Sequence, residues 1–257
     1  MGLQGRSPGL RHPRAEGLSR MSKIAVQDER GFNQVFAPVG STPLRMRRRN
    51  DWFIAQAARL GAKRILEIGC GTGEAAAQVA AGTSAEVVAV DISDAFLERA
   101  RANHQAPNLR YEKLDLLGAD PLRLGRFDLV FGNGILHHLV VRLPEVLRAL
   151  HGVTGPGGGL AFIEPNFLNP YCAFIFGTGL GRRLAKLEPD EMAFTPAQLR
   201  RALPEAGWRE VEVATRDFLL PGLPTALAKP VLAVEPALES LALTRWLAQS
   251  HFVTARA

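Results

Sequence analysis

The chain has 257 residues, 47% hydrophobic and 22% charged, a composition that excludes collagen-like, coiled-coil and disordered proteins. The formal net charge is +6, but residues 1–50 hold ten Lys and Arg against three acids, so the rest of the chain is nearly neutral. Because that rest has no basic stripe with interleaved aromatic residues, the charge does not indicate a nucleic-acid partner.

The amino-terminal part of the chain divides near residue 20. Residues 1–20 are rich in Gly, Pro, Arg and Ser without an apolar period, and we expect a disordered tail there. Met21 is an alternative translational start. The arginine-rich run from Arg45 to Arg49 leads into an amphipathic helix that ends at Gly61. We interpret these arginines as the solvated face of that helix, and we expect residues 21–257 to form a single domain.

From Lys63 onward, short β-rich runs alternate with helical stretches, which is typical of a parallel sheet covered by helices on both faces. Seven strands are predicted, at 64–68, 86–90, 109–113, 127–131, 160–163, 208–213 and 252–255. Helices are predicted at 74–81, 94–103, 143–151 and 196–206, the last with Thr195 as its cap. We therefore expect an α/β fold with a doubly wound, seven-stranded, mostly parallel sheet.

Two segments interrupt this alternation. Residues 167–194 lie between the fifth strand and its helix, and residues 217–250 separate the last two strands and contain an amphipathic stretch from Val231 to Leu247. Insertions at these points lie near the carboxyl edge of the sheet, where open α/β sheets bind ligands. We expect both to form the acceptor side of a site. The aromatic residues of the first insertion fit core packing or contact with an apolar or membrane-anchored acceptor.

A glycine-rich turn directly follows the first predicted strand. Gly69, Gly71 and Gly73 stand between that strand and the predicted helix at 74–81. Glycines there let the backbone approach a ligand closely, and the N–H groups at the start of the helix face it. The second strand is followed by Asp91, 18 residues after Gly73, where a carboxylate can accept both hydroxyls of a ribose. The spacing predicts an adenosine-type ligand.

Two ligand classes use this layout. Gly71-x-Gly73-x-x-Ala76 can be aligned with the dinucleotide fingerprint, which would indicate a nicotinamide cofactor. Glu74, however, occupies the place where Gly69-x-Gly71 would need its third glycine. An acidic strand end at Glu67 would repel a pyrophosphate and suits a cationic amino group.

With these features the chain resembles the class I S-adenosylmethionine-dependent methyltransferases. Glu67–Gly73 resembles the first motif of that family, Phe127–Leu139 its fourth, and Gly155–Leu160 the turn before strand five, so the resemblance spans residues 63–166 as the cofactor-binding core. It implies a Rossmann-like methyltransferase fold and S-adenosylmethionine as cofactor. The cofactor contacts that it implies are Glu67, Gly69, Cys70, Gly71, Gly73, Asp91, Ile92, Asp115, Leu116 and Asn133.

The resemblance also assigns roles to these residues. Glu67, the backbone near Gly69, and Asn133 would hold the methionine part of the cofactor. Asp91 would bind the ribose, whereas Asp115 and Ile92 would contact the adenine.

Two consecutive histidines, His137 and His138, follow the fourth strand, where the methyl acceptor would lie. We expect a helix here, in which consecutive side chains diverge by about 100°, so at most one of the two can act as a base. A neutral imidazole can take the proton of an attacking hydroxyl. The resemblance favours His137 as the catalytic residue and His138 as the inward one, and a structural role is the alternative for both.

Other polar residues at this edge have more than one interpretation. Glu164 and Asn166, at the end of the fifth strand, could contact a substrate or serve as cap and turn residues. The fourth strand ends in Gly132-Asn133 without an acidic cluster, so we expect no metal. Cys70 fits the glycine-rich turn as a small residue rather than as a nucleophile.

The sequence therefore predicts an enzyme that methylates a small molecule, a glycan or a lipid-linked intermediate, on oxygen rather than nitrogen. The alternatives are a regulatory protein that binds the nucleoside without catalysis and, less favoured, an NAD(P)-dependent oxidoreductase.

The two cysteines and the lack of a secretory signal point to the reducing cytoplasm. No apolar run approaches the roughly 20 residues of a membrane-spanning helix, so a membrane contact would be peripheral. The oligomeric state is not predicted.

Overall fold

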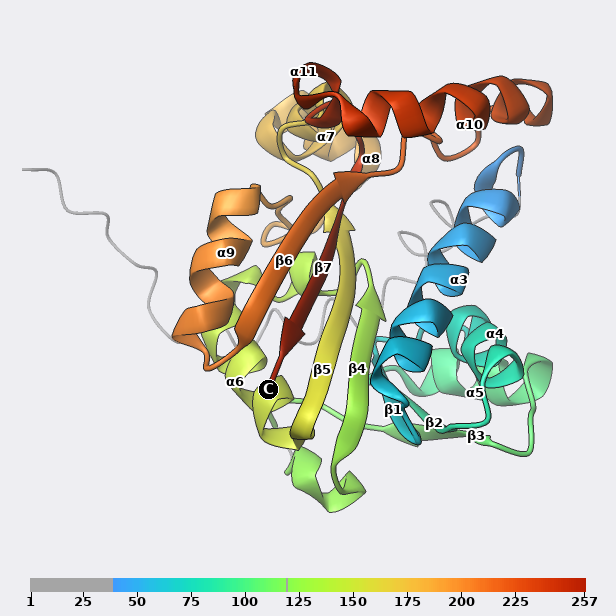
Figure 1. Ribbon diagram of the computed structural model, residues 1–257, viewed down its shortest axis with the longest axis vertical. Helices are drawn as coiled ribbons and strands as arrows, with labels where there is room; N and C mark the ends of the chain where they lie inside the picture. The colour runs from blue at the N-terminus through green and yellow to red at the C-terminus, as the bar shows by residue number, and fades with distance from the viewer. Residues whose placement is uncertain (1–38, 119) are drawn as a thin grey trace, which may run out of the picture.

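The computed structural model describes residues 39–118 and 120–257, and the predicted tail of residues 1–20 lies outside them. A seven-stranded sheet has the order β3-β2-β1-β4-β5-β7-β6 (Figure 1). The strands are β1 (Arg64–Ile68), β2 (Glu86–Asp91), β3 (Leu109–Lys113), β4 (Phe127–Asn133), β5 (Thr154–Pro165), β6 (Arg209–Arg216) and β7 (Ser250–Arg256). Strands β1 to β5 pair in parallel, and β7 is antiparallel to both β5 and β6. The predicted fold class is confirmed.

Helices cover both faces of the sheet and divide the core into two layers. One face carries α3 (Thr42–Leu60), α4 (Glu74–Gly82) and α5 (Asp94–Asn103), and the other carries α6 (Leu143–Val153) and α9 (Pro196–Glu205). Alternate side chains of a strand point to opposite faces. In β4, Leu129 and Phe131 pack in the layer of α3 and α4, whereas Val130 packs in the layer of α6. This two-sided burial explains the continuous apolar runs of the central strands.

Local signals place most helices within a few residues of their predicted ends. Helix α9 begins with a complete capping box: the Thr195 side chain accepts from the Gln198 backbone N–H, and the Gln198 side chain accepts from the Thr195 N–H.

The prediction for the fifth strand is wrong at its start. Strand β5 begins at Thr154, which pairs with Phe127 before a register shift, so the glycine-rich run 155–159 lies inside the strand rather than in a turn before it.

The two insertions form four helices at the carboxyl end of the sheet (Figure 1). Helices α7 (Pro170–Gly177) and α8 (Gly179–Ala185) follow β5, and α10 (Thr225–Ser240) and α11 (Ala242–Arg245) follow β6. The expected single stretch from Val231 to Leu247 is instead two helices, because Leu241 adopts an extended backbone between them. Within the described ranges, no helix combines the length and the apolar character needed to cross a membrane.

Candidate active site

The glycine-rich turn lies at the carboxyl end of β1 and leads into α4. Gly69 and Gly73 have φ angles of 65° and 90°, which non-glycine residues rarely adopt. A Cβ on Gly73 would lie 2.7 Å from the Tyr111 hydroxyl, so the turn has no room for a side chain there. The conformation and packing of the turn therefore require glycine at Gly73, and the contact of its backbone with a ligand stays a prediction.

Asp91 connects this turn to the end of β2. Its Oδ2 accepts a hydrogen bond from the Gly71 backbone N–H at 2.9 Å, and its Oδ1 accepts from Ser93 N–H at 2.9 Å. Burial raises the pKa of Asp91, and the two hydrogen bonds oppose that shift. Each carboxylate oxygen has a second lone pair, so the group can hold the turn and still accept a ribose hydroxyl.

The predicted adenine contacts lie beside this edge. Ile92 is 38% exposed directly after Asp91, and Leu116 is buried. Asp115, which follows β3, is exposed and accepts from the Leu117 N–H at 3.0 Å. These side chains lie at the ends of neighbouring strands, as the sequence predicts. Their contact with an adenine stays a prediction.

Glu67 is a buried carboxyl at the end of β1, and it is 3% exposed. Within the described part of the chain, its Oε2 has no hydrogen-bond partner. Burial raises the pKa of Glu67 to about 8, and the neighbouring carboxylates Asp91 and Glu74 add to the shift. A buried carboxyl oxygen without a partner marks a place for a cationic ligand group. Cys70, in the turn, is buried, and burial raises the pKa of its thiol, so it is unsuited to act as a nucleophile.

Glu164 organises the segment that follows β4. Its buried carboxylate accepts the backbone N–H groups of Ile135, Leu136 and His137 at 3.1, 2.8 and 3.2 Å. It also lies 3.0 Å from the Nδ1 atom of His137. The sequence leaves open whether Glu164 contacts a substrate or caps a turn, and the structure shows that it caps the turn after β4. Because the carboxylate can only accept, the hydrogen bond places a proton on Nδ1 and leaves Nε2 free to accept one.

The His137 ring is nearly enclosed, with a side chain 14% exposed. Burial lowers its pKa, and the neighbouring His138 lowers it further, against the opposing effect of Glu164. His137 is therefore a neutral imidazole at neutral pH. This protonation state is the one that a general base requires.

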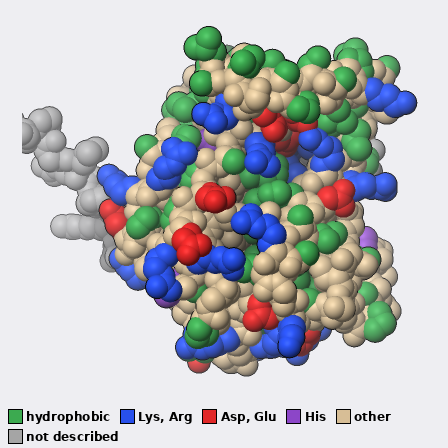
Figure 2. All heavy atoms as spheres, in the orientation of Figure 1, with side chains coloured by type: hydrophobic (Ala, Val, Ile, Leu, Met, Phe, Trp, Pro, Cys, Tyr) green, Lys and Arg blue, Asp and Glu red, His purple; other side chains and the backbone are tan. Residues whose placement is uncertain are grey.

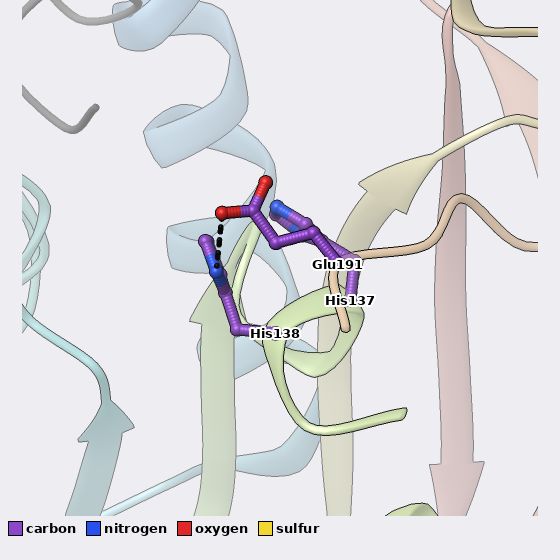
Figure 3. A group of neighbouring side chains, drawn as sticks. All are labelled: His137, His138 and Glu191. Carbon is purple, nitrogen blue, oxygen red and sulfur yellow. Dashed lines mark ion pairs between the residues drawn. The ribbon is translucent and has the colours of Figure 1, made fainter. Parts of the chain in front are cut away.

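The expectation that the rings of His137 and His138 point apart is wrong. Both residues lie in a 3₁₀ turn, Leu136–His138, and their ring centroids are 4.1 Å apart. Glu191, from the loop before α9, approaches them, and its Oε1 lies 3.3 Å from the Nδ1 of His138 (Figure 3). The Met192 N–H donates to the His137 carbonyl at 3.1 Å and holds that loop in place. The sequence contains no local signal for Glu191.

Glu191 and His138 shift each other's pKa values. Burial opposes protonation of His138, but the ion pair with Glu191 outweighs it and raises the pKa of His138. The same pair lowers the pKa of Glu191, although burial acts in the opposite direction. His138 and His137 therefore have pKa values displaced in opposite directions from the ordinary histidine value.

His137, His138 and Glu191 are also the candidate metal ligands among the described residues. One potential ligand atom from each lies within 4.8 Å of the others. Two imidazoles and a carboxylate form a ligand set that zinc and iron accept. The ion pair between His138 and Glu191 satisfies both side chains without a metal. That the protein requires no metal stays a prediction.

Two arginines of α3 contradict the interpretation of the basic run as a solvated face. Arg45 and Arg49 are only 7% and 6% exposed. The Nη2 of Arg49 donates to Asp217 Oδ2 at 2.7 Å, and Arg45 Nε lies 2.9 Å from the same oxygen. Burial opposes ionisation of Asp217, but the two guanidinium groups lower its pKa. The face is buried because the second insertion, which begins at Asp217, covers this part of α3.

Arg49 connects this cluster to the sheet edge. Its Nη1 donates to the Oδ1 of Asn133, at the end of β4, at 3.0 Å. A cavity of about 150 Å³ adjoins the cluster. It is lined by Arg45, Arg48, Arg49, Trp52, Arg216, Asp217, Glu239 and Phe252. A polar cavity rich in arginine therefore borders the carboxyl edge of the sheet beside the predicted methyl donor site.

Comparison with known proteins shows which proteins the chain resembles. Residues 65–158 match the family model of a methyltransferase domain. An uncharacterised methyltransferase of Mycobacterium tuberculosis is 35% identical over 113 residues, which are 43% of this chain and 56% of that protein. The trans-aconitate 2-methyltransferase of Deinococcus radiodurans is 39% identical over 103 residues, 40% of this chain and 38% of that protein. The chain thus spans about half, or less, of the length of these relatives.

Longer matches are more distant. A ubiquinone biosynthesis O-methyltransferase of Acinetobacter baylyi is 28% identical over 171 residues, 64% of this chain and 69% of that protein. An S-adenosylmethionine-dependent methyltransferase from Mesorhizobium loti has a TM-score of 0.56 at 22% identity, covering 86% of this chain and all of that one. Magnesium protoporphyrin IX methyltransferase from Synechocystis has a TM-score of 0.56 at 15% identity, covering 95% of both chains. Residues 65–158 therefore resemble a methyltransferase domain, and the fold of the chain is that of S-adenosylmethionine-dependent methyltransferases.

Proposed function

We propose that this protein transfers the methyl group of S-adenosylmethionine to an oxygen atom of a small molecule. The observation that carries the proposal is the turn of Gly69 to Gly73, held by Asp91 beside the buried carboxyl of Glu67, whose Oε2 has no hydrogen-bond partner among the described residues. A dinucleotide would bring a pyrophosphate next to that carboxyl and oppose its ionisation, whereas the amino group of S-adenosylmethionine would favour and pair with the ionised carboxylate. The residues present therefore fit this cofactor better than a nicotinamide dinucleotide.

Each cofactor-side residue has a task in this proposal. Glu67 accepts the ammonium group, Asp91 accepts the ribose hydroxyls, and Asn133 contacts the methionine end. Asp115 contacts the adenine, against which Ile92 and Leu116 pack, and the backbone of Gly69, Cys70, Gly71 and Gly73 approaches the ligand. When bound, the cofactor supplies a methyl group already activated on a sulfonium.

The chain itself must position the acceptor, exclude water and accept a proton. His137 is suited to the last task because Glu164 fixes its ring and burial keeps it neutral. The free Nε2 would take the proton of the acceptor hydroxyl as the methyl group passes from the cofactor sulfur to that oxygen. Positioned general bases contribute about 10²–10⁴ in rate. This arrangement favours an enzyme over a protein that only binds the nucleoside.

The acceptor side is formed by the insertions 167–194 and 217–250. The arginine-rich cavity that Arg49 links to Asn133 suits a polar or anionic part of the acceptor, and the aromatic residues of α7 suit an apolar part. A lipid-linked intermediate combines both, and a glycan would use the cavity alone. Relatives named for trans-aconitate and for ubiquinone biosynthesis agree with a small acceptor and, in the second case, with O-methylation.

The test is transfer of a labelled methyl group. Purified protein is incubated with methyl-labelled S-adenosylmethionine and with separated aqueous and lipid extracts of cells, and the incorporated label is measured. We expect transfer into one extract, strongly reduced by His137→Ala and unaffected by the matched variant His151→Ala, which packs on Trp208 away from the site. Binding of S-adenosylhomocysteine without transfer into any extract would instead favour the non-catalytic alternative.

A further inference from the structure

The helices at the carboxyl edge carry most of the exposed apolar side chains in the part of the chain that the structure describes. Segments 168–192 and 220–246, which contain α7, α8, α10 and α11, hold twelve of the seventeen exposed large hydrophobic residues. Leu243 is 86% exposed and Leu184 is 68% exposed. Single exposed apolar residues are ordinary, but such a concentration marks an interaction surface. We call the exposed side chains of these two segments the helical cap.

The two segments of the helical cap are joined to each other. The Nδ2 of Asn166, just before α7, donates to the carbonyl oxygens of Trp246 and Ala248 at 2.8 and 2.7 Å. Asn169 Nδ2 donates to the carbonyl of Leu247 in the same stretch. The four helices lie together across one end of the sheet (Figure 1), and hydrophobic side chains crowd that end of the molecule (Figure 2). The exposed apolar residues therefore belong to one end of the fold.

The exposed charges of the helical cap have one sign. They are Arg183, Lys186, Lys229 and Arg245. The five acidic residues of the same segments are buried or half-buried. Among these acids, Glu191 pairs with His138, Glu235 pairs with Arg48, and Glu239 accepts from the Asp217 backbone N–H. A face that combines apolar side chains, an exposed Trp246 and basic residues has the chemistry of an interfacial membrane-binding surface.

We propose that the helical cap binds the surface of an anionic phospholipid membrane. Its apolar side chains would enter the boundary between headgroups and acyl chains, and its four basic residues would meet anionic headgroups. A second copy of this chain fits less well, because a self-complementary contact would bring the four basic residues of each copy toward like charges. Access of the enzyme to an acceptor anchored in the bilayer follows only if the proposed methyl transfer holds. Membrane binding itself does not depend on it.

The test is co-sedimentation of the full chain with lipid vesicles, without cofactor or acceptor. We expect binding to vesicles of mixed phosphatidylcholine and phosphatidylglycerol, weaker binding to phosphatidylcholine alone, and weakening by salt. Leu184→Ser and Leu243→Ser should each lower the partition coefficient about tenfold. Lys229→Gln and Arg245→Gln should each lower it about fivefold. The matched control is Leu122→Ser, which replaces a leucine 48% exposed before β4, at the opposite edge of the sheet, and should have no effect.

Several results would overturn the proposal. One is no binding of the full chain to anionic vesicles, and another is an equal loss with Leu122→Ser and Leu184→Ser. A dimer that Leu243→Ser converts to a monomer, without vesicle binding, would assign the face to a second copy. Vesicle binding only after removal of residues 1–38 would assign it to that segment. Circular dichroism of each variant shows whether a loss of binding is due to unfolding. Because the vesicle assay contains no cofactor, its result does not depend on whether the proposed methyl transfer holds.

Discussion

Glu164 holds His137 through two different atoms, the backbone N–H at 3.2 Å and the ring Nδ1 at 3.0 Å. The carboxylate comes from β5 and the histidine from the turn after β4, so the contact joins the ends of two neighbouring strands. A ring fixed in this way presents Nε2 in a defined direction, which is the geometry of a histidine base oriented by a carboxylate.

The first prediction concerns this pair. His137→Ala should lower the single-turnover rate about 10²–10⁴-fold with little change in cofactor affinity. Glu164→Gln should lower the rate less, because the amide can still cap the turn through its oxygen but no longer stabilises the protonated ring. Rapid-quench kinetics with labelled cofactor measures both. If His138→Ala alone lowered the rate of the chemical step, the roles of the two histidines would be reversed.

The pH dependence of the rate distinguishes the two histidines independently. A base must be deprotonated, so the rate rises with pH through its pKa and is constant above it. Burial and the neighbouring His138 lower the pKa of His137, whereas Glu191 raises that of His138 against the effect of burial. We expect the acidic limb of the wild-type single-turnover profile below pH 6.5. A limb above that value would favour His138.

A third prediction follows from Glu67. Burial raises its pKa to about 8, so the free protein holds a protonated carboxyl at pH 7. An ammonium group placed beside it favours the carboxylate, so binding of S-adenosylhomocysteine should release close to one proton at pH 7, and affinity should rise with pH up to about 8. Calorimetry in two buffers of different ionisation enthalpy measures the release. It should vanish in Glu67→Gln, and an undiminished release in that variant would show that another group titrates.

The positions of the glycine-rich turn, of Asp91 and of the Thr195 cap were predictable because their signals are local. The glycines of the turn, Asp91 and the Thr195 cap each act within a few residues of the chain or at the end of a strand. Residues that meet across long separations were not predictable. Asp217 reaches Arg49 across 168 positions, and Glu191 approaches His138 from a loop whose sequence has no motif.

The misread elements have specific physical causes. A regular helix would make the two histidines diverge, but the backbone forms a short 3₁₀ turn capped by Glu164. A charged run on a helix usually forms its solvated face, but two of the arginines of α3 are buried. Their burial depends on the second insertion, whose position over α3 has no signature in the sequence.

Metal removal provides a fourth prediction. Because the ion pair of His138 and Glu191 satisfies both side chains without a metal, dialysis against a strong chelator should leave methyl transfer unchanged, and metal analysis of the purified protein should find no stoichiometric ion. Excess zinc should inhibit by occupying the pair His138 and Glu191. Activity lost on chelation and restored by one divalent ion, with Glu191→Gln unable to respond, would show instead that His137, His138 and Glu191 form a metal centre.

The central claim is that the turn tied to Asp91 binds S-adenosylmethionine, and equilibrium calorimetry with S-adenosylhomocysteine and with NAD tests it most directly. Loss of a ribose partner costs about 1–3 kcal/mol, or roughly ten- to a hundredfold in affinity. We expect S-adenosylhomocysteine to bind, NAD not to bind, and Asp91→Ala to weaken binding by that factor while circular dichroism shows a folded protein. Binding of NAD without binding of S-adenosylhomocysteine, or unchanged affinity in Asp91→Ala, would contradict the claim.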